Sequence, residues 1–147
     1  MDITVRKAVP SDGRLILSLV EALAAYEKLA PPDEDAGKRL LADLFSARPR
    51  LECYIAESEG RAAGYAFVLE TYSSFLALPT LYMEDLFVLP EYRGKRAGFA
   101  LFLICVCASP AGAQPVLTAI RCGTLTDGVS DAPRKNVVLP VACRLLT

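Results

Sequence analysis

The sequence predicts an α+β domain in which a mostly antiparallel sheet is flanked by helices. Three observations support this fold class. Strand-like alternation and helix-like apolar stripes both occur, in the order β-α-α-β-β-β-α. Two of the three consecutive strands are joined by a tight turn, which is typical of an antiparallel meander. The chain has 147 residues, 53% of them hydrophobic, and can therefore bury one core without a metal or disulfide.

The first two predicted elements are a strand and a helix. Residues 3–9 alternate in hydrophobicity and predict an opening strand. Residues 10–12 then start a helix with Ser11 or Asp12 as its N-cap, and the pair Pro31-Pro32 ends it. The apolar stripe of this helix comprises Leu15, Ile16, Leu19, Val20, Leu23 and Tyr26.

A second helix and three strands follow. The acidic residues 33–35 suit the start of a helix. Its buried side comprises Leu40, Leu41, Leu44 and Phe45. Strands are predicted at Cys53–Ala56 and Ala63–Thr71, joined by a turn at 59–61, and at Leu81–Val88.

The last part of the chain differs in character from the first. Residues 89–94 predict a loop, Ala97–Cys107 an apolar helix and Val116–Ile120 a further strand. Charged side chains fall from 27 in the first 102 residues to 6 in the last 45, and all six tyrosines lie in the first part. Four of the five cysteines lie in the second part. We expect one domain over the whole chain, with residues 103–147 as an atypical tail.

Composition argues against several classes of protein. Lys and Arg number 16 and Asp and Glu 17, so the basic surplus of a general nucleic-acid binder is missing. The absence of histidine excludes serine–histidine and cysteine–histidine catalytic units and histidine-ligated zinc. The five cysteines lack CxxC spacing and suggest reduced thiols. Because the longest apolar run has twelve residues, we expect a cytoplasmic protein that does not bind a membrane.

The segment from residue 81 to residue 102 carries the clearest chemical signal. It reads LYMEDLFVLPEYRGKRAGFALF, a strand that enters a glycine-containing loop and then a helix. Such a helix start presents backbone N–H groups and a positive dipole end to an anion. Arg93, Lys95 and Arg96 add positive charge. The pattern predicts a phosphate-bearing ligand, and spacing alone also fits an ordinary solvated basic turn.

This segment resembles motif A of the GNAT superfamily of acetyl-CoA-dependent N-acetyltransferases, a strand followed by Arg/Gln-x-x-Gly-x-Gly/Ala. Residues 81–88 and 90–94 are similar to the diamine branch, which includes spermidine/spermine and thialysine-type enzymes. Four further segments resemble this branch and occur in the same order along the chain: residues 5–8, 11–12, 25–29 and 72–76. The resemblance covers residues 3–102. It implies a GNAT-like fold and acetyl transfer from acetyl-CoA to a small primary amine (a diamine, polyamine or lysine analogue). We also expect a homodimer, and no metal, since no local pair of cysteines has ligand spacing.

The resemblance also implies roles for individual residues. The residues whose backbone would bind the pantetheine arm and thioester carbonyl are Leu86, Phe87 and Val88. The residues that would surround the pyrophosphate are Arg93, Gly94, Lys95, Arg96, Ala97, Gly98 and Phe99. The residues that match amine-facing positions are Tyr26, Glu27 and Glu84.

A physical argument separately favours Glu84 as the catalytic residue. An alkylamine with a pKa of about 10.4 arrives protonated and cannot attack a thioester. A nearby carboxylate can bind the ammonium and help remove its proton, directly or through water. Neighbouring side chains of a strand point to opposite faces, so at most one of Glu84 and Asp85 should face a given cleft. Solvated surface carboxylates are the alternative interpretation, also for Glu27.

Two departures from the family pattern bear on mechanism. The middle glycine of the motif falls on Arg96, whose side chain would either block the phosphate or swing out and contact it. The family's tryptophan strand, Asn-x-x-Ala segment and tyrosine general acid are missing, since there is no tryptophan and no tyrosine after Tyr92. Three hypotheses follow: an active N-acetyltransferase, a non-catalytic acetyl-CoA-binding or dimer-forming module, and a family member whose residues 103–147 come from a shifted reading frame.

Overall fold

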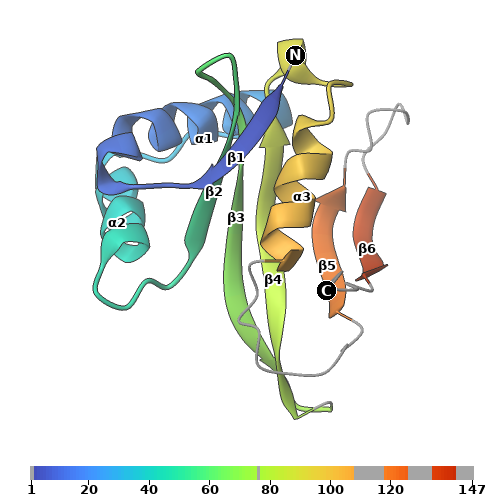
Figure 1. Cartoon of the computed structure of the whole chain (residues 1–147). Coiled ribbons are helices and arrows are strands. Elements are labelled where there is room, and N and C mark those ends of the chain that lie inside the picture. Colours follow the sequence, from blue (N-terminus) through green and yellow to red (C-terminus); the bar gives the residue numbers. More distant parts are fainter. Residues whose placement is uncertain (1, 76, 108–117, 126–133, 142–147) are drawn as a thin grey trace.

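An antiparallel four-stranded sheet forms the centre of the computed structural model, which describes residues 2–75, 77–107, 118–125 and 134–141, with side chains up to residue 105. In spatial order its strands are β1 (Ile3–Lys7), β2 (Glu52–Ser58), β3 (Arg61–Ser73) and β4 (Leu78–Val88). The helices α1 (Gly13–Glu27) and α2 (Glu34–Phe45) cover one face of the sheet, and α3 (Ala97–Cys107) covers the other (Figure 1). The strands β5 (Thr118–Leu125) and β6 (Arg134–Val141) form a separate antiparallel pair.

The sheet divides the interior into two apolar clusters. Under α1 and α2, the fully buried Ile16 and Tyr65 pack with Phe87. Under α3, Met83 packs with the fully buried Leu101. Both faces of β3 and β4 are therefore covered near their middle, as expected for strands with long apolar runs.

The structure confirms the predicted order of elements up to α3 and the bounds of α3, whereas β6 was not predicted. The first strand ends at Lys7, earlier than predicted, because Pro10–Asp12 forms a 3-10 turn before α1. Asp12 does precede α1, but its carboxylate accepts hydrogen bonds from the Val9 N–H at 2.8 Å and from Arg6 Nη1 at 2.7 Å. It therefore stabilises the 3-10 turn instead of capping α1.

The strands β3 and β4 are longer than the sequence predicts. The predicted ranges 63–71 and 81–88 extend to 61–73 and 78–88 in the structure. The additional part is a hairpin that projects beyond the helices, and side chains such as Tyr72 are exposed there. Since no helix covers this end, burial does not impose the alternation by which strands are recognised in a sequence.

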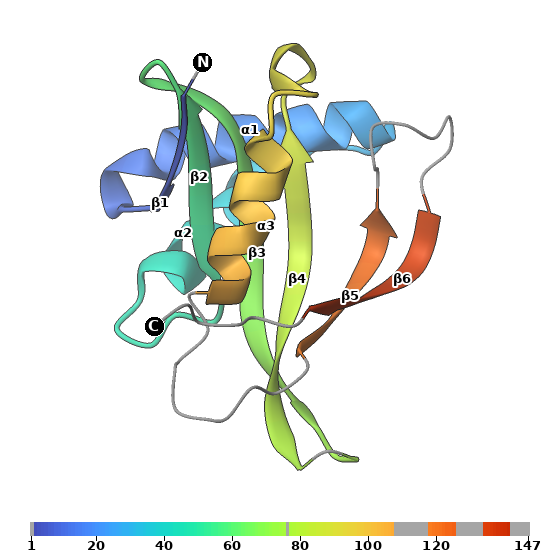
Figure 2. The same ribbon diagram turned by 45° about the vertical axis from the view of Figure 1, so that its right-hand side comes forward.

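The backbone ladder is interrupted between β4 and β5. Figures 1 and 2 both show β5 beside β4, yet the ladder partner of β5 is β6. The predicted strand Val116–Ile120 overlaps β5 at residues 118–120, β5 continues to Leu125, and residues 116 and 117 lie outside the described part of the chain.

Two of the five cysteines have described side chains. Cys53 on β2 and Cys105 on α3 are free and buried. Burial raises the pKa of each thiol to about 12, so both stay protonated and unreactive at neutral pH. Within the described residues, no helix is long and apolar enough to cross a membrane.

Candidate functional site

The C-terminal end of β4 directs backbone groups away from its sheet partner. The Leu89 N–H donates to the Ala63 carbonyl on β3 at 2.9 Å. Successive residues of an antiparallel strand turn their N–H and C=O groups to alternate edges. The groups of Leu86 and Val88 therefore face the edge toward β5. In the described ranges no ladder joins the two strands, so this edge can hydrogen-bond an extended ligand.

Gly64 allows β3 and β4 to approach closely at this place. It is paired with Val88, and a Cβ atom built on it would collide with the Phe87 carbonyl oxygen and lie 2.9 Å from the Val88 Cα. Any larger residue would push the end of β4 away. The position of the predicted cofactor-binding backbone thus depends on a glycine in the neighbouring strand.

The loop after β4 ends in two residues with left-handed backbone conformation. Gly94 has φ of 74° and Arg96 has φ of 67°. The Ala100 N–H is the first to bond back along α3, to the Arg96 carbonyl at 2.9 Å. The N–H groups of Ala97, Gly98 and Phe99 therefore lack an intrahelical acceptor and form the positive helix end predicted for a phosphate.

Arg93 makes contacts within the protein that the sequence did not reveal. Its Nε donates to the Val88 carbonyl at 3.0 Å, and its guanidinium lies 4.4 Å from the centre of the Tyr26 ring and 5.9 Å from that of Phe87. Arg93 thus links the loop to the end of α1 through a cation–π contact. Lys95 contacts the Tyr92 ring at 5.4 Å, and the exposed Arg96 carries the remaining positive charge of the loop.

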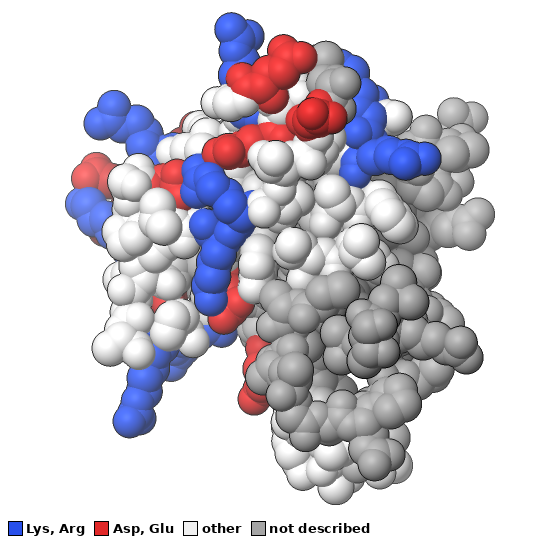
Figure 3. Space-filling model, viewed as in Figure 1, with Lys and Arg blue, Asp and Glu red and all other residues white. Residues whose placement is uncertain are grey.

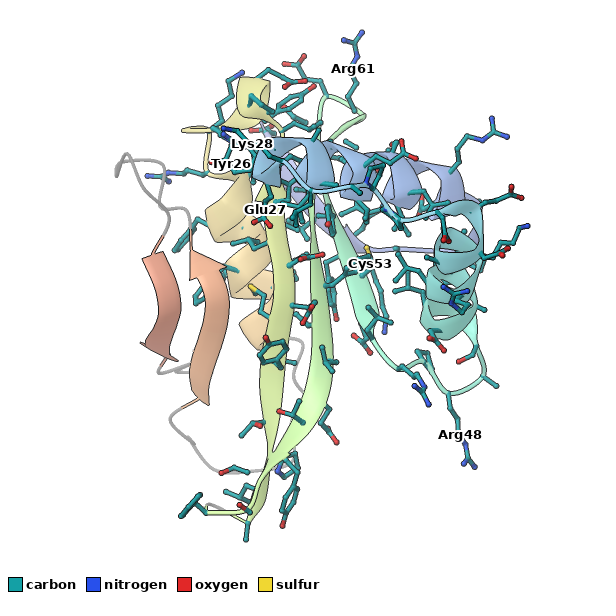
Figure 4. All side chains as sticks on the ribbon, turned by 180° about the vertical axis from the view of Figure 1, so that it is seen from behind. Tyr26, Glu27, Lys28, Arg48, Cys53 and Arg61 are labelled. Carbon is teal, nitrogen blue, oxygen red and sulfur yellow. The ribbon has the colours of Figure 1, made fainter. Side chains whose placement is uncertain are left out.

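Tyr26 and Glu27 lie at the end of α1 beside the same loop. Figure 4 shows both residues there, followed by Lys28. Tyr26 is 44% exposed and its ring centre lies 6.2 Å from that of Phe87, so it sits at the rim of the apolar stripe, not within the core. The fold brings the predicted amine-facing end of α1 next to the predicted cofactor-binding end of β4.

A β-bulge places two carboxylates at the site. The register between β3 and β4 passes from Phe67↔Asp85 to Val68↔Met83, so Glu84 is the extra residue. The regular alternation assumed from the sequence therefore does not hold at Glu84 and Asp85. Glu84 is exposed, whereas Asp85 is partly buried. Bulges often re-aim side chains beside active sites, and this one lies on β4 directly before the predicted cofactor-binding residues Leu86 to Val88.

Asp85 has an electrostatic environment that the sequence did not reveal. Its Oδ2 accepts a hydrogen bond from the Tyr65 hydroxyl at 2.9 Å. Burial raises the pKa of Asp85, the Tyr65 bond lowers it in part, and the negative charges of Glu84 and Glu27 raise it further. Three carboxyl groups from α1 and β4 therefore lie within electrostatic reach of one another. In the sequence, the only sign of this environment is a pair of acidic residues within an otherwise apolar strand, and that sign does not distinguish Asp85 from Glu84.

The surface around the site is unevenly charged. Figure 3 shows charged side chains at the upper end and down the left side of the molecule, and a mostly uncharged surface over α3. The exposed apolar side chains of α3 include Phe99 at 64% and Leu103 at 49% exposure. The loop and the start of α3 therefore lie where the surface changes from charged to apolar.

Residues 18–106 match the model of the acetyltransferase (GNAT) family. The chain belongs to this family. The thialysine N-epsilon-acetyltransferase of Bos taurus is 34% identical over 104 residues, 65% of this chain and 61% of that protein. The spermidine/spermine N(1)-acetyltransferase-like protein 1 of Homo sapiens is 33% identical over 101 residues, 64% of this chain and 14% of that protein. The chain thus spans about three-fifths of the length of the thialysine-type relatives that it matches.

Solved structures agree on the fold. A "possible acetyltransferase" from Clostridium difficile 630 has a TM-score of 0.64 at 17% identity, over 75% of this chain and 72% of that one. The GNAT-like fold and the family predicted by resemblance are therefore confirmed. The roles assigned to individual site residues remain predictions.

Proposed function

We propose that this chain is an acetyl-CoA-dependent N-acetyltransferase whose acceptor is a small primary amine such as a diamine, polyamine or lysine analogue. One observation carries the proposal. Glu84 and Asp85 lie on β4, the strand that carries the unpaired backbone edge and leads through the loop into α3, and Glu27 at the end of α1 is within electrostatic reach of Asp85. An anionic cosubstrate and a cationic acceptor would therefore meet at the end of one strand.

The residues on the cofactor side suit acetyl-CoA. The outward backbone groups of Leu86 and Val88 match the amides of a pantetheine arm, and the free N–H groups of Ala97 to Phe99 match a pyrophosphate. The Val88 carbonyl is already bound by Arg93, which leaves the Val88 N–H as the donor at that residue. Acetyl-CoA would supply the acetyl group as a thioester.

The residues on the acceptor side suit an ammonium group. Glu84 is exposed on the bulge and Glu27 is exposed at the end of α1, so both are accessible to a solvated cation. Tyr26 adds an aromatic ring at the rim, one face of which is already covered by the Arg93 guanidinium. Two carboxylates on separate elements fit a ligand with more than one positive charge.

The first experiment tests cofactor binding and acetyl transfer separately. Thermal unfolding with and without millimolar CoA should show stabilisation, about 2.7 kcal/mol at 100 times the Kd. Acetylated product is then measured by mass spectrometry with a panel of diamines and lysine analogues. Glu84→Gln should lower kcat/KM, whereas Glu21→Gln, the same change at an exposed position of α1, should not. A folded protein that CoA does not stabilise would contradict the proposal.

We infer that turnover is slow. The chain has no tyrosine after Tyr92 to protonate a departing thiolate. Stabilisation by CoA without any acetylated product would favour the non-catalytic module instead.

The family model ends at residue 106, close to where the composition changes. Translating the encoding DNA beyond codon 102 in the other two frames tests the frame-change hypothesis: absence of a tryptophan-containing strand and a later tyrosine in both frames would reject it. The homodimer stays a prediction, to be tested by light scattering.

A further inference from the structure

Tyr65 is a buried tyrosine whose hydroxyl has one hydrogen-bond acceptor. The residue is fully buried within the cluster under α1 and α2. Its ring meets that of Phe67 edge-on at 4.8 Å between centres, and the Phe87 ring lies 6.3 Å away. These contacts hold the hydroxyl against Asp85 Oδ2 at 2.9 Å. Tyr65 is therefore packed in a way that orients the Asp85 carboxyl.

The other oxygen of this carboxyl has no protein hydrogen-bond partner among the described residues. Among the described residues, Tyr65 provides the hydrogen bond recorded for Asp85, and it reaches Oδ2. Asp85 is partly exposed and follows the bulge residue Glu84. Oδ1 can thus meet a water molecule or an amine in the site, while Oδ2 stays bound to the protein. This is the arrangement of a carboxylate held by a neighbouring residue for proton transfer.

We propose that Asp85 is the group that accepts the proton of the acceptor ammonium, with Tyr65 as its positioning residue and the exposed Glu84 as a binding carboxylate. This inference rests on the proposed function. The proton passes from the ammonium nitrogen to Asp85 Oδ1, directly or through one water. The ammonium becomes a neutral amine with a free electron pair, and the carboxylate becomes a neutral acid. Solvent later receives the proton, so charge is conserved.

The surroundings of Asp85 support this role. The groups that face it are Tyr65 from β3, Glu84 from β4, Glu27 from α1 and, at longer range, Cys53 from β2. Burial and the neighbouring negative charges raise the pKa of Asp85, so its carboxylate is a stronger base than an ordinary aspartate. The Tyr65 hydroxyl opposes this effect and keeps the group ionised to a lower pH.

The kinetic test compares three variants with the wild type. Asp85→Asn should lower kcat by about 10²–10⁴-fold with an alkylamine, and by much less with an amine of low pKa that is already neutral. Tyr65→Phe removes a bond that lowers the pKa of Asp85, so the acid limb of the kcat/KM profile should move to higher pH. Tyr54→Phe is the matched control, because this buried tyrosine donates to Glu52 at 2.8 Å instead. Full kcat in Asp85→Asn, or an unmoved acid limb in Tyr65→Phe, would overturn the proposal.

A second measurement does not depend on turnover. Carbon-13 NMR of labelled aspartate in the folded protein follows the Asp85 carboxyl, assigned through Asp85→Asn. We expect titration above the ordinary range of aspartate, and a further upward shift in Tyr65→Phe but not in Tyr54→Phe. Ordinary titration, or no response to Tyr65→Phe, would reject the inference even in an inactive protein. A wild type that shows the expected titration but acetylates no amine would refute the proposed function while leaving the Tyr65–Asp85 pairing in place.

Discussion

Replacing Arg96 by glycine should stabilise the protein, although it removes a whole side chain. Arg96 has φ of 67°, a left-handed conformation that non-glycine residues rarely adopt. It is exposed, and its carbonyl receives the first hydrogen bond of α3 from the Ala100 N–H at 2.9 Å. The helix start thus requires this backbone conformation whichever residue is present.

The expected magnitude follows from two opposing terms. A left-handed conformation costs a residue with a Cβ about 1–2 kcal/mol, which glycine avoids. Glycine loses about 0.5–1 kcal/mol more conformational entropy on folding. The difference is a stabilisation of about 0.75 kcal/mol, within a range of about 0 to 1.5 kcal/mol.

Urea unfolding measures this difference, read as a change in midpoint at constant slope. Arg96→Ala keeps the Cβ and removes the charge, so the step from alanine to glycine isolates the backbone term. Lys95→Gly is the matched control: Lys95 is not among the residues with positive φ, and glycine there should destabilise by about 0.5–1 kcal/mol. An Arg96→Gly protein less stable than Arg96→Ala would refute the reasoning. CoA affinity of the same variants separates a blocking arginine, whose removal tightens binding, from a phosphate-contacting one, whose removal weakens it.

Three further predictions concern the framework of the site. Gly64→Ala should lower the free energy of unfolding by about 1–3 kcal/mol in urea and weaken CoA binding, because the alanine Cβ collides with the Phe87 carbonyl. Unchanged CoA binding would show that the close approach at Gly64 does not position the cofactor site. Asp12→Ala should cost about 1–2 kcal/mol at neutral pH. The Arg6 guanidinium lowers the pKa of Asp12, so this cost should vanish as pH falls through that lowered value, and a cost that persists in acid would contradict the ion pair. The pKa of Asp85 is raised in the folded state, so wild-type stability should fall as pH rises from the ordinary pKa of aspartate through the raised pKa of Asp85. Asp85→Asn should lack this fall. Parallel pH profiles of thermal unfolding for the two proteins would contradict a raised pKa of Asp85.

Much of the fold was predictable from local sequence patterns. The order of elements up to α3 and the bounds of α3 were predicted correctly, because alternation and apolar stripes report which side of an element is buried. The short connection from β4 through the loop to α3 was also recognisable, since glycine and a run of basic residues occur together there. Resemblance to the family then predicted which residues gather at the end of β4.

Other features depend on partners far away in the sequence. The hairpin of β3 and β4 extends past the helices because cross-strand hydrogen bonds continue where burial stops. The bulge at Glu84 is a property of the register between two strands, and a periodicity of two along one strand cannot reveal it. The sequence argument treated Glu84 and Asp85 as alternating side chains for that reason.

The sequence by itself determined the order of the elements up to α3 and the family, because each is encoded in a local pattern or motif. Tertiary structure alone decided what the residues of the site contact. Arg93 lies on Tyr26, 67 positions earlier, and Asp85 is held by Tyr65 across the sheet. The absence of a ladder between β4 and β5 in the described ranges is likewise visible only in the structure. Such contacts arise from the packing of separate elements, whose geometry is set by the whole fold and not by neighbours along the chain.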